Sequence, residues 1–167
     1  MKYKRGIIIG RFQPFHNGHK FLIEEALKKC EKIIIGIGNA EGKGENDPLD
    51  WRARKKILEK FVDSEKIKDR VLMIIPLVNN PSDQIWLENL IKQTGPVDVV
   101  IGNNEWVNGI FENAKIPAIR PGHLDRERLE GTKIRGLIRE GKKWEDRVPP
   151  YLVPLVKKAS SSNGLRK

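Results

Sequence analysis

Short apolar runs alternate with segments of helical periodicity along this chain of 167 residues. Four runs rich in isoleucine and valine are predicted to form strands, and a fifth run is a weaker candidate: 6–10, 32–38, 71–76, 97–102 and 116–120. Their apolar residues follow one another without polar alternation. That pattern is typical of strands buried on both faces of a parallel sheet.

Between these runs, apolar residues recur at the spacing of helices. Five helices are predicted: around 21–30, from Asp47-Pro48 to 62, around 85–90, over 131–138 and from Pro149-Pro150 onward. Alternating strands and helices predict an α/β fold, a Rossmann-like doubly wound parallel sheet of about five strands flanked by helices. Residues 1–159 are expected to form one domain, and 160–167 a flexible tail.

Composition excludes several classes of protein. With 38% hydrophobic and 32% charged residues, the chain differs from disordered proteins. No apolar stretch approaches the roughly 20 residues of a membrane span, and no secretory leader follows the basic start. The single Cys30 excludes a disulfide framework or a cysteine zinc site, and it is expected to be buried late in a helix. We therefore expect a cytoplasmic protein.

The net charge of +10 indicates an anionic partner, which could be a nucleic acid, a membrane surface or a polyphosphate. Basic residues are interspersed with acidic ones and form no single stripe. This distribution argues against a dedicated nucleic-acid binder.

The most informative segment is Gly10–His19, GRFQPFHNGH, directly after the first predicted strand. Ligands of doubly wound sheets bind beyond the carboxyl ends of the strands. Gly18 would let the backbone approach a ligand closely, and Asn17 is a suitable N-cap for a helix whose N–H groups face it. His16, His19 and Arg11 can then contact phosphate. A metal half-site and two ordinary helix-start histidines are the alternatives.

A second segment with phosphate chemistry is Gly131-Thr132-Lys133-Ile134-Arg135. Thr132 can cap the helix that it opens, and the helix N–H groups can hold a phosphate. Arg135 lies on the same side one turn later, and its guanidinium suits bidentate contact with phosphate. Alternatively, Thr132 is only a cap and Arg135 a surface residue.

Together these motifs resemble the HxGH nucleotidyltransferase superfamily. His16-Asn17-Gly18-His19 matches its H-x-G-H core, and 131–135 matches the G-T-x-x-R form of its second motif. The form GRFQPFH is most similar to nicotinamide mononucleotide (NMN) adenylyltransferases of the archaeal type. The resemblance runs from about residue 6 to about residue 150.

This resemblance implies transfer of AMP from ATP to NMN, forming NAD and pyrophosphate, with Mg²⁺ bound mainly through the ATP phosphates. It also implies a homo-oligomer, with a hexamer as one form, and no nucleic-acid or membrane partner. One alternative is another phosphorylated acceptor, FMN or nicotinic acid mononucleotide. A non-catalytic nucleotide-binding module is the other.

The resemblance also implies roles for individual residues. His16 and His19 would contact the α- and β-phosphates, and Arg11 and Arg135 the β- and γ-phosphates. The expected substrate-binding residues are Gly10, Phe12, Gly18, Gly38, Asp47, Arg54, Asn80, Asp83, Trp86, Asn103, Asn104, Gly131 and Thr132.

Two of these assignments carry alternatives. Trp86 would stack on the nicotinamide ring, a cation–π contact, or would be a core aromatic residue. Archaeal-type members have an arginine before the Asp-Pro pair, where this chain has Asn46. The missing cation could be supplied by Arg54 or Lys43.

Overall fold

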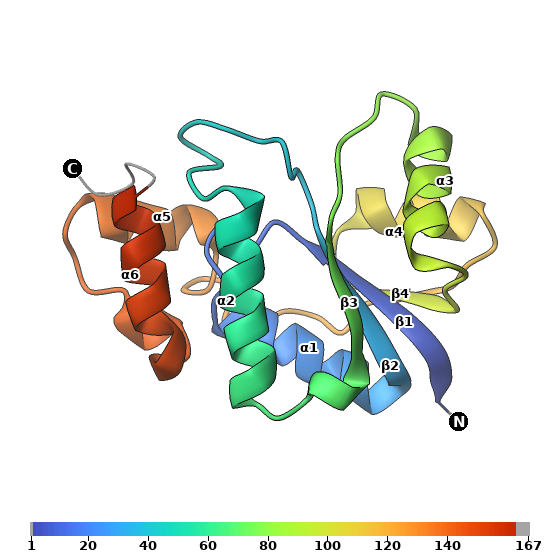
Figure 1. Ribbon diagram of the computed structural model, residues 1–167, viewed down its shortest axis with the longest axis horizontal. Helices are drawn as coiled ribbons and strands as arrows, with labels where there is room; N and C mark the ends of the chain where they lie inside the picture. Colours follow the sequence, from blue (N-terminus) through green and yellow to red (C-terminus); the bar gives the residue numbers. More distant parts are fainter. Residues whose placement is uncertain (1, 163–167) are drawn as a thin grey trace.

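A five-stranded parallel sheet forms the centre of the computed structural model, which describes residues 2–162 (Figure 1). The strand order is β3-β2-β1-β4-β5. The strands are β1 (Tyr3–Gly10), β2 (Cys30–Ile37), β3 (Val71–Pro76), β4 (Val99–Ile101) and β5 (Ala118–Ile119). The predicted Rossmann-like, doubly wound α/β fold is confirmed.

Within residues 2–162, six α-helices flank the sheet: α1 (Asn17–Lys29), α2 (Trp51–Ser64), α3 (Asp83–Thr94), α4 (Glu105–Asn113), α5 (Gly131–Arg139) and α6 (Val153–Ser162). Short 3₁₀ turns lie at Lys68–Arg70, Glu145–Arg147 and Pro150–Leu152. Figure 1 shows α3 and α4 on one side of the sheet and α2 and α6 on the other. Within residues 2–162, no helix is long and apolar enough to cross a bilayer.

Consecutive strand residues enter opposite cores, as expected for strands covered on both faces. Ile8 packs with residues of α1, α2, α5 and α6, whereas the adjacent Ile7 packs with residues of α3 and α4. In β2, Ile34 joins the Ile7 side, and Ile33 and Ile35 join the Ile8 side. This double burial explains the uninterrupted apolar runs in the sequence.

The strand order reverses between β1 and β4. From β1 the chain proceeds outward to β2 and β3, and it then crosses back to place β4 and β5 on the other side of β1. In the register, Ile7 pairs with Ile34 of β2 and with Val100 of β4. The carboxyl ends of β1 and β4, at Gly10 and Ile101, are therefore the expected ligand position.

Several helix boundaries differ from their predictions. Helix α2 begins at Trp51 rather than at Asp47-Pro48, because Asp50 caps it by accepting the Ala53 N–H at 2.8 Å. Helix α4 is not among the five predicted helices, and the side chain of Asn104 caps it by accepting the Val107 N–H at 3.2 Å.

The ends of two other elements also differ. Cys30 is buried as expected, but it is the first residue of β2 rather than part of a helix. Helix α6 continues through Ser160, which is buried, so the predicted domain boundary at 159 falls inside it. Pro154 lies in its first turn, where no N–H donor is needed. Residues 163–167 of the predicted tail lie outside the described part.

The contact between β1 and the start of β2 gives a testable prediction. A Cβ added at Gly6 would lie 2.4 Å from Cys30 Sγ and 2.8 Å from Ile101 Cδ1. Gly6→Ala should therefore lower the free energy of unfolding by about 1–3 kcal/mol in urea denaturation. The loss should be smaller in a Cys30→Ala background, where the sulfur is absent.

Gly109→Ala is the matched control, since it adds a Cβ within α4 that meets no atom within 4 Å apart from its chain neighbours and the backbone of its own helix. It should raise stability by about 0.5–1 kcal/mol. Equal effects of the two substitutions would contradict the close packing at Gly6.

Candidate functional site

Three cavities adjoin one another at the carboxyl ends of β1 and β4. We call the smallest, of about 260 Å³, the histidine cavity; it is lined by Arg11, Phe12, Gln13, His16, His19, Asn104, Gly131, Thr132 and Arg135. The tryptophan cavity, of about 470 Å³, lies between Trp86, Trp106 and the 38–47 loop. The loop cavity, of about 450 Å³, lies between the start of α1 and residues 122–131. Asn104 lines all three.

The two histidines of the first motif cap α1 with their own side chains. His16 Nδ1 accepts the Gly18 N–H at 3.0 Å, and His19 Nδ1 accepts the His16 N–H at 3.1 Å. The N-cap is therefore His16 and not Asn17, whose amide instead donates to the Asp146 carbonyl at 3.3 Å. Because both Nδ1 atoms accept, both rings carry their proton on Nε2, which is free to donate to a ligand.

Burial keeps the two rings neutral. His16 is 7% exposed, and burial lowers its pKa to about 4. Burial, and secondarily the nearby His16, lowers the pKa of His19 well below its usual value. The rings stack at 3.8 Å between centroids, and Phe12 packs on His19 at 4.7 Å. At neutral pH the pair thus supplies N–H donors rather than positive charge.

Close packing at two glycines shapes both motifs. A Cβ at Gly18 would lie 2.8 Å from the His16 ring. A Cβ at Gly131 would lie 2.8 Å from Arg135 Nη1 and 3.1 Å from the Gln13 carbonyl oxygen. The two motifs are therefore directly joined: Arg135 Nη1 donates to that Gln13 carbonyl at 2.7 Å.

The second motif does not use Thr132 as a cap. The N-cap of α5 is Glu130, which makes no side-chain cap bond, and the Thr132 hydroxyl instead accepts from Arg135 Nη2 at 3.3 Å. The first-turn N–H groups of α5 therefore have no capping side chain and face the histidine cavity beside Gly131 and Thr132. Such a helix end favours an anion.

Arg54 was predicted to bind substrate, but in this structure its guanidinium contacts loops of the protein. It is fully buried, and it donates to the carbonyls of Arg11 and Gly38 at 2.9 Å, of Asn39 at 3.1 Å and of Asp50 at 3.3 Å. Arg54 lines none of the three cavities. It holds the loops after β1 and β2 against α2.

Arg11 and Asp47 form an ion pair where the histidine and tryptophan cavities meet. Arg11 Nη2 lies 2.6 Å from Asp47 Oδ1 and 3.0 Å from the Asn46 carbonyl oxygen. Arg11 lines both cavities, and Asp47 lines the tryptophan cavity together with Gly38. These predicted residues are thus brought together, with the arginine half-exposed and able to change partners.

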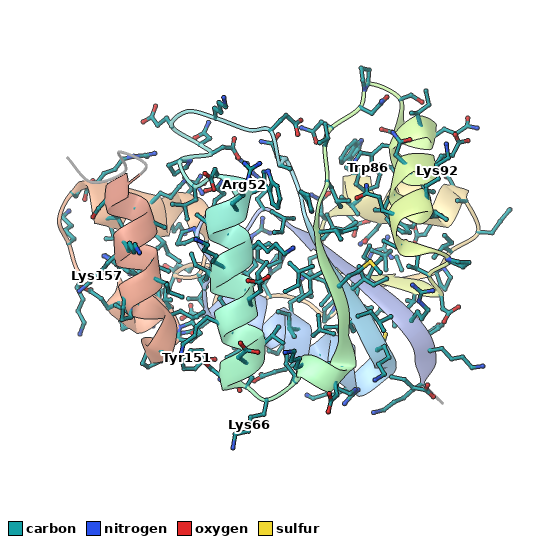
Figure 2. The ribbon with its side chains drawn as sticks, viewed as in Figure 1. Arg52, Lys66, Trp86, Lys92, Tyr151 and Lys157 are labelled. Carbon is teal, nitrogen blue, oxygen red and sulfur yellow. The ribbon has the colours of Figure 1, made fainter. Side chains whose placement is uncertain are left out.

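The tryptophan cavity has one buried and one exposed indole. Trp86, 6% exposed, projects from α3 toward the carboxyl end of β3 (Figure 2), and packs in the α3–α4 core. Trp106 is 56% exposed, 6.2 Å from Trp86 between centroids. Trp86 is therefore a core residue that also lines the tryptophan cavity.

Asparagines also line this cavity, the predicted Asn104 among them. Asn79 Nδ2 donates to Asn39 Oδ1 at 2.7 Å, and both residues are lining residues. The predicted residues Asn80 and Asp83 do not line it. Asn80 Oδ1 accepts the Ser82 N–H, and Asp83 is the first residue of α3. Asn39 and Trp106 were not predicted as site residues. The structure distinguishes them, because the Trp106 indole is exposed and Asn39 has a positive φ of 51°.

His123, which neither motif includes, lines the loop cavity. Asn103 fixes the neighbouring loop, because its amide donates to the Gly122 carbonyl at 2.7 Å and accepts the Gly122 N–H at 2.9 Å. Arg126 also lines this cavity. Arg120 is engaged elsewhere, with Glu105 at 2.6 Å and Glu112 at 2.8 Å.

Candidate metal ligands are sparse. Among residues 2–162, no group of three or more His, Cys, Asp or Glu side chains is placed to hold a metal ion. The carboxylate at the edge of the histidine cavity, Asp47, already pairs with Arg11.

Comparison with known proteins identifies the family to which this chain belongs. Residues 7–137 match the cytidylyltransferase-like family. The chain is similar to the nicotinamide-nucleotide adenylyltransferase of Methanospirillum hungatei, with 33% identity over 97% of this chain and 92% of that protein. It is also similar to that of Archaeoglobus fulgidus, with 31% identity over 97% and 95%.

Two solved structures share the fold. One is a bifunctional NMN adenylyltransferase/ADP ribose pyrophosphatase from Francisella tularensis, with a TM-score of 0.79 at 22% identity over 97% of this chain. This chain spans only about half of it, 54%. The other is a putative nicotinate-nucleotide adenylyltransferase from Vibrio parahaemolyticus, with a TM-score of 0.61 at 18% identity, covering 93% of this chain and 99% of that one.

The buried His16 predicts a pH dependence of stability. Its pKa is about 4 when folded and about 6.5 when unfolded, so the unfolded chain binds more protons between these values. The free energy of unfolding should therefore fall by about 3 kcal/mol as the pH is lowered from 6.5 to 4, whereas His16 does not reduce it above pH 6.5. Urea denaturation between pH 4 and 8 measures it.

His16→Asn keeps a good N-cap residue and removes this titration, so its stability should fall less at acid pH. The exposed His123→Asn is the control and should behave as the wild type does. Equal acid sensitivity of wild type and His16→Asn would contradict the assigned burial effect.

Proposed function

Because the chain belongs to the cytidylyltransferase-like family and aligns over nearly its full length with archaeal nicotinamide-nucleotide adenylyltransferases, we propose that it transfers AMP from ATP to NMN. The products are NAD and pyrophosphate, and the protein is a nucleotidyltransferase. The observation that carries this proposal is the self-capping histidine pair, whose free Nε2–H groups share one cavity with Arg135 and the N-terminus of α5.

In the reaction, a phosphate oxygen of NMN forms a bond to the α-phosphorus of ATP. The bond from that phosphorus to its bridging oxygen breaks, and pyrophosphate leaves with the electron pair. The attacking phosphate is already an anion, so no general base is needed. Rate enhancement comes from positioning and from stabilising charge where it develops.

The three cavities supply places for the parts of both substrates. The tryptophan and loop cavities share Ile9, Gly10 and Asn104, so NMN and the adenosine of ATP would meet above the end of β1. The pyridinium ring of NMN fits beside the two indoles, a cation–π arrangement. The reacting phosphates would then lie at the histidine cavity, with Thr132 and Gly131 beside them.

We assign His16 and His19 to the phosphates at the reacting centre, as neutral donors, and Arg11 and Arg135 to the phosphates that leave. Mg²⁺ is proposed to enter bound to the ATP phosphates, because the described residues offer no carboxylate cage. When bound, it neutralises phosphate charge. Arg11 can exchange Asp47 for a phosphate oxygen without losing a charge partner.

The proposed setting is the cytoplasm, with ATP and NMN rather than nucleic acid or membrane as partners. In support, basic residues of the 120–147 segment are engaged in ion pairs, such as Arg128 with Asp146 at 2.8 Å, rather than forming an open basic face. We also propose a homo-oligomer, a hexamer being one form. The outer strand β3 carries Leu72 44% exposed, which favours an interface there.

The test of this function is pyrophosphate release from ATP and Mg²⁺ with one acceptor at a time. Release with NMN should be accompanied by NAD, measured with an NAD-dependent dehydrogenase. Release with only FMN or nicotinic acid mononucleotide would keep the chemistry but replace the acceptor. No release with any acceptor, from folded protein that binds ATP, would favour a non-catalytic binding module instead.

His19→Ala is the matched inactive variant for this assay. Removing one N–H donor from the reacting centre should lower kcat on the order of 10²-fold or more. The variant should stay folded, because α1 keeps its His16 cap bond to Gly18. Turnover close to that of the wild type would remove His19 from the mechanism.

The two tryptophans should separate acceptor binding from stability. Trp106→Ala should raise the KM for NMN about fivefold through loss of an aromatic contact, and should leave the KM for ATP unchanged. Trp86→Ala should raise the KM for NMN too, but should also cost about 3–5 kcal/mol of stability because the ring is buried. Trp86→Phe is the control that keeps an aromatic core. An unchanged KM for NMN in both alanine variants would place the pyridine ring elsewhere.

A further inference from the structure

Arg11 and Arg135 line the histidine cavity, and the charge of a third arginine, Arg139, which has no assigned role, acts on Arg135. Arg139 follows Arg135 by one turn on the same side of α5, a rise of about 6 Å. It donates a hydrogen bond to the Glu45 carbonyl, and Arg11 donates to the carbonyl of the next residue, Asn46, at 3.0 Å. Arg11, which follows β1, and Arg139, in α5, therefore contact adjacent residues of the 38–47 loop.

The cluster carries more positive charge than its partners balance. Burial lowers the pKa of Arg135 most, and the charges of Arg11 and Arg139 lower it further. Asp47 pairs closely with Arg11 at 2.6 Å, but the Glu45 carboxylate is 3.8 Å from Arg139 Nη1 and its side chain is 82% exposed. Such an exposed contact is a weak counter-ion pair. Like charges held together in this way indicate a site for an anion.

We propose that Arg139 binds the terminal phosphates of ATP and the departing pyrophosphate, exchanging Glu45 for phosphate oxygens. The inference rests on the proposed adenylyl transfer. Helix α5 lines the histidine cavity with Gly131, Thr132 and Arg135, so the next turn reaches the phosphates farthest from the histidines. Those phosphates receive the electron pair when the bond to the α-phosphorus breaks.

Asn46 itself brings no charge to this part of the loop. Of the two residues considered as replacements for the missing cation, Arg54 is fully buried and Lys43 is an exposed loop residue. Arg139 is a further cation, which α5 brings to this part of the loop in addition to Arg11. Arg139 keeps about a third of its side chain exposed, so its guanidinium can turn from Glu45 to a ligand without unfolding any element.

The experiment measures pyrophosphate binding to the full chain by calorimetry, and the KM for pyrophosphate in the reverse reaction with NAD. Arg139→Gln should weaken both about tenfold, because it removes a charge-assisted hydrogen bond. The KM for NMN and the stability should not change. Arg139→Lys should lie between, since it keeps the charge and loses the planar fork.

Arg52→Gln is the matched control. It removes the same charge from an exposed arginine on α2, which lies over the Trp51 ring at 4.8 Å (Figure 2), and it should bind pyrophosphate as the wild type does. Glu45→Gln should bind pyrophosphate two- to threefold more tightly, because the counter-ion that competes for Arg139 is gone. A merely structural Arg139 would not produce this gain.

Two results would overturn the inference: Arg139→Gln binding pyrophosphate as Arg52→Gln does, or losing stability while Glu45→Gln binds no more tightly. Either can occur in a chain that still makes NAD, and the proposed function then stands. A wild type that binds pyrophosphate but makes no NAD from ATP and NMN would refute the proposed function, whatever Arg139 does.

Discussion

A single buried guanidinium holds the loops of the site in place. Arg54 donates to four backbone carbonyls from the ends of β1 and β2 and the start of α2. A buried charge is tolerated only when it is fully hydrogen-bonded, and buried loop carbonyls need donors in the same way. Here the buried guanidinium of Arg54 donates to the buried loop carbonyls, so both the charge and the carbonyls are hydrogen-bonded. The shape of the histidine and tryptophan cavities depends on these hydrogen bonds, because Arg11 and Gly38 are themselves lining residues.

The histidines show how structure and proposed chemistry share the same side chains. In each ring Nδ1 closes the cap of α1, and this bond leaves the proton on Nε2. The cap therefore fixes the position, tautomer and charge of both donors at once. Gly18 is required because any Cβ would strike the His16 ring, so the glycine of the motif serves the cap at least as directly as it serves a ligand.

What the sequence could predict depended on the range of the interaction. The strands and the two motifs were predictable, because double burial and phosphate chemistry leave local patterns. The predicted N-caps at Asn17 and Thr132 are wrong. The side chains of His16 and His19 cap α1 instead, and the Thr132 hydroxyl accepts a hydrogen bond from Arg135. The partners of Arg54 and Arg139 could not be predicted, because they lie up to 43 and 94 residues away in the sequence. No local rule reports such pairings.

The distribution of charge in the site suits the reaction proposed for it. In the proposed step an anionic phosphate of NMN approaches the α-phosphate of ATP, so donors at the reacting centre reduce the repulsion between the two groups in the transition state. Negative charge increases on the pyrophosphate that leaves. Under this proposal, the neutral donors His16 and His19 would lie at the reacting centre, and the guanidiniums of Arg11, Arg135 and Arg139 would place full positive charge beside the leaving pyrophosphate. The proposed reaction would then depend on the order of neutral and charged donors along the phosphate chain and not only on the net charge of +10.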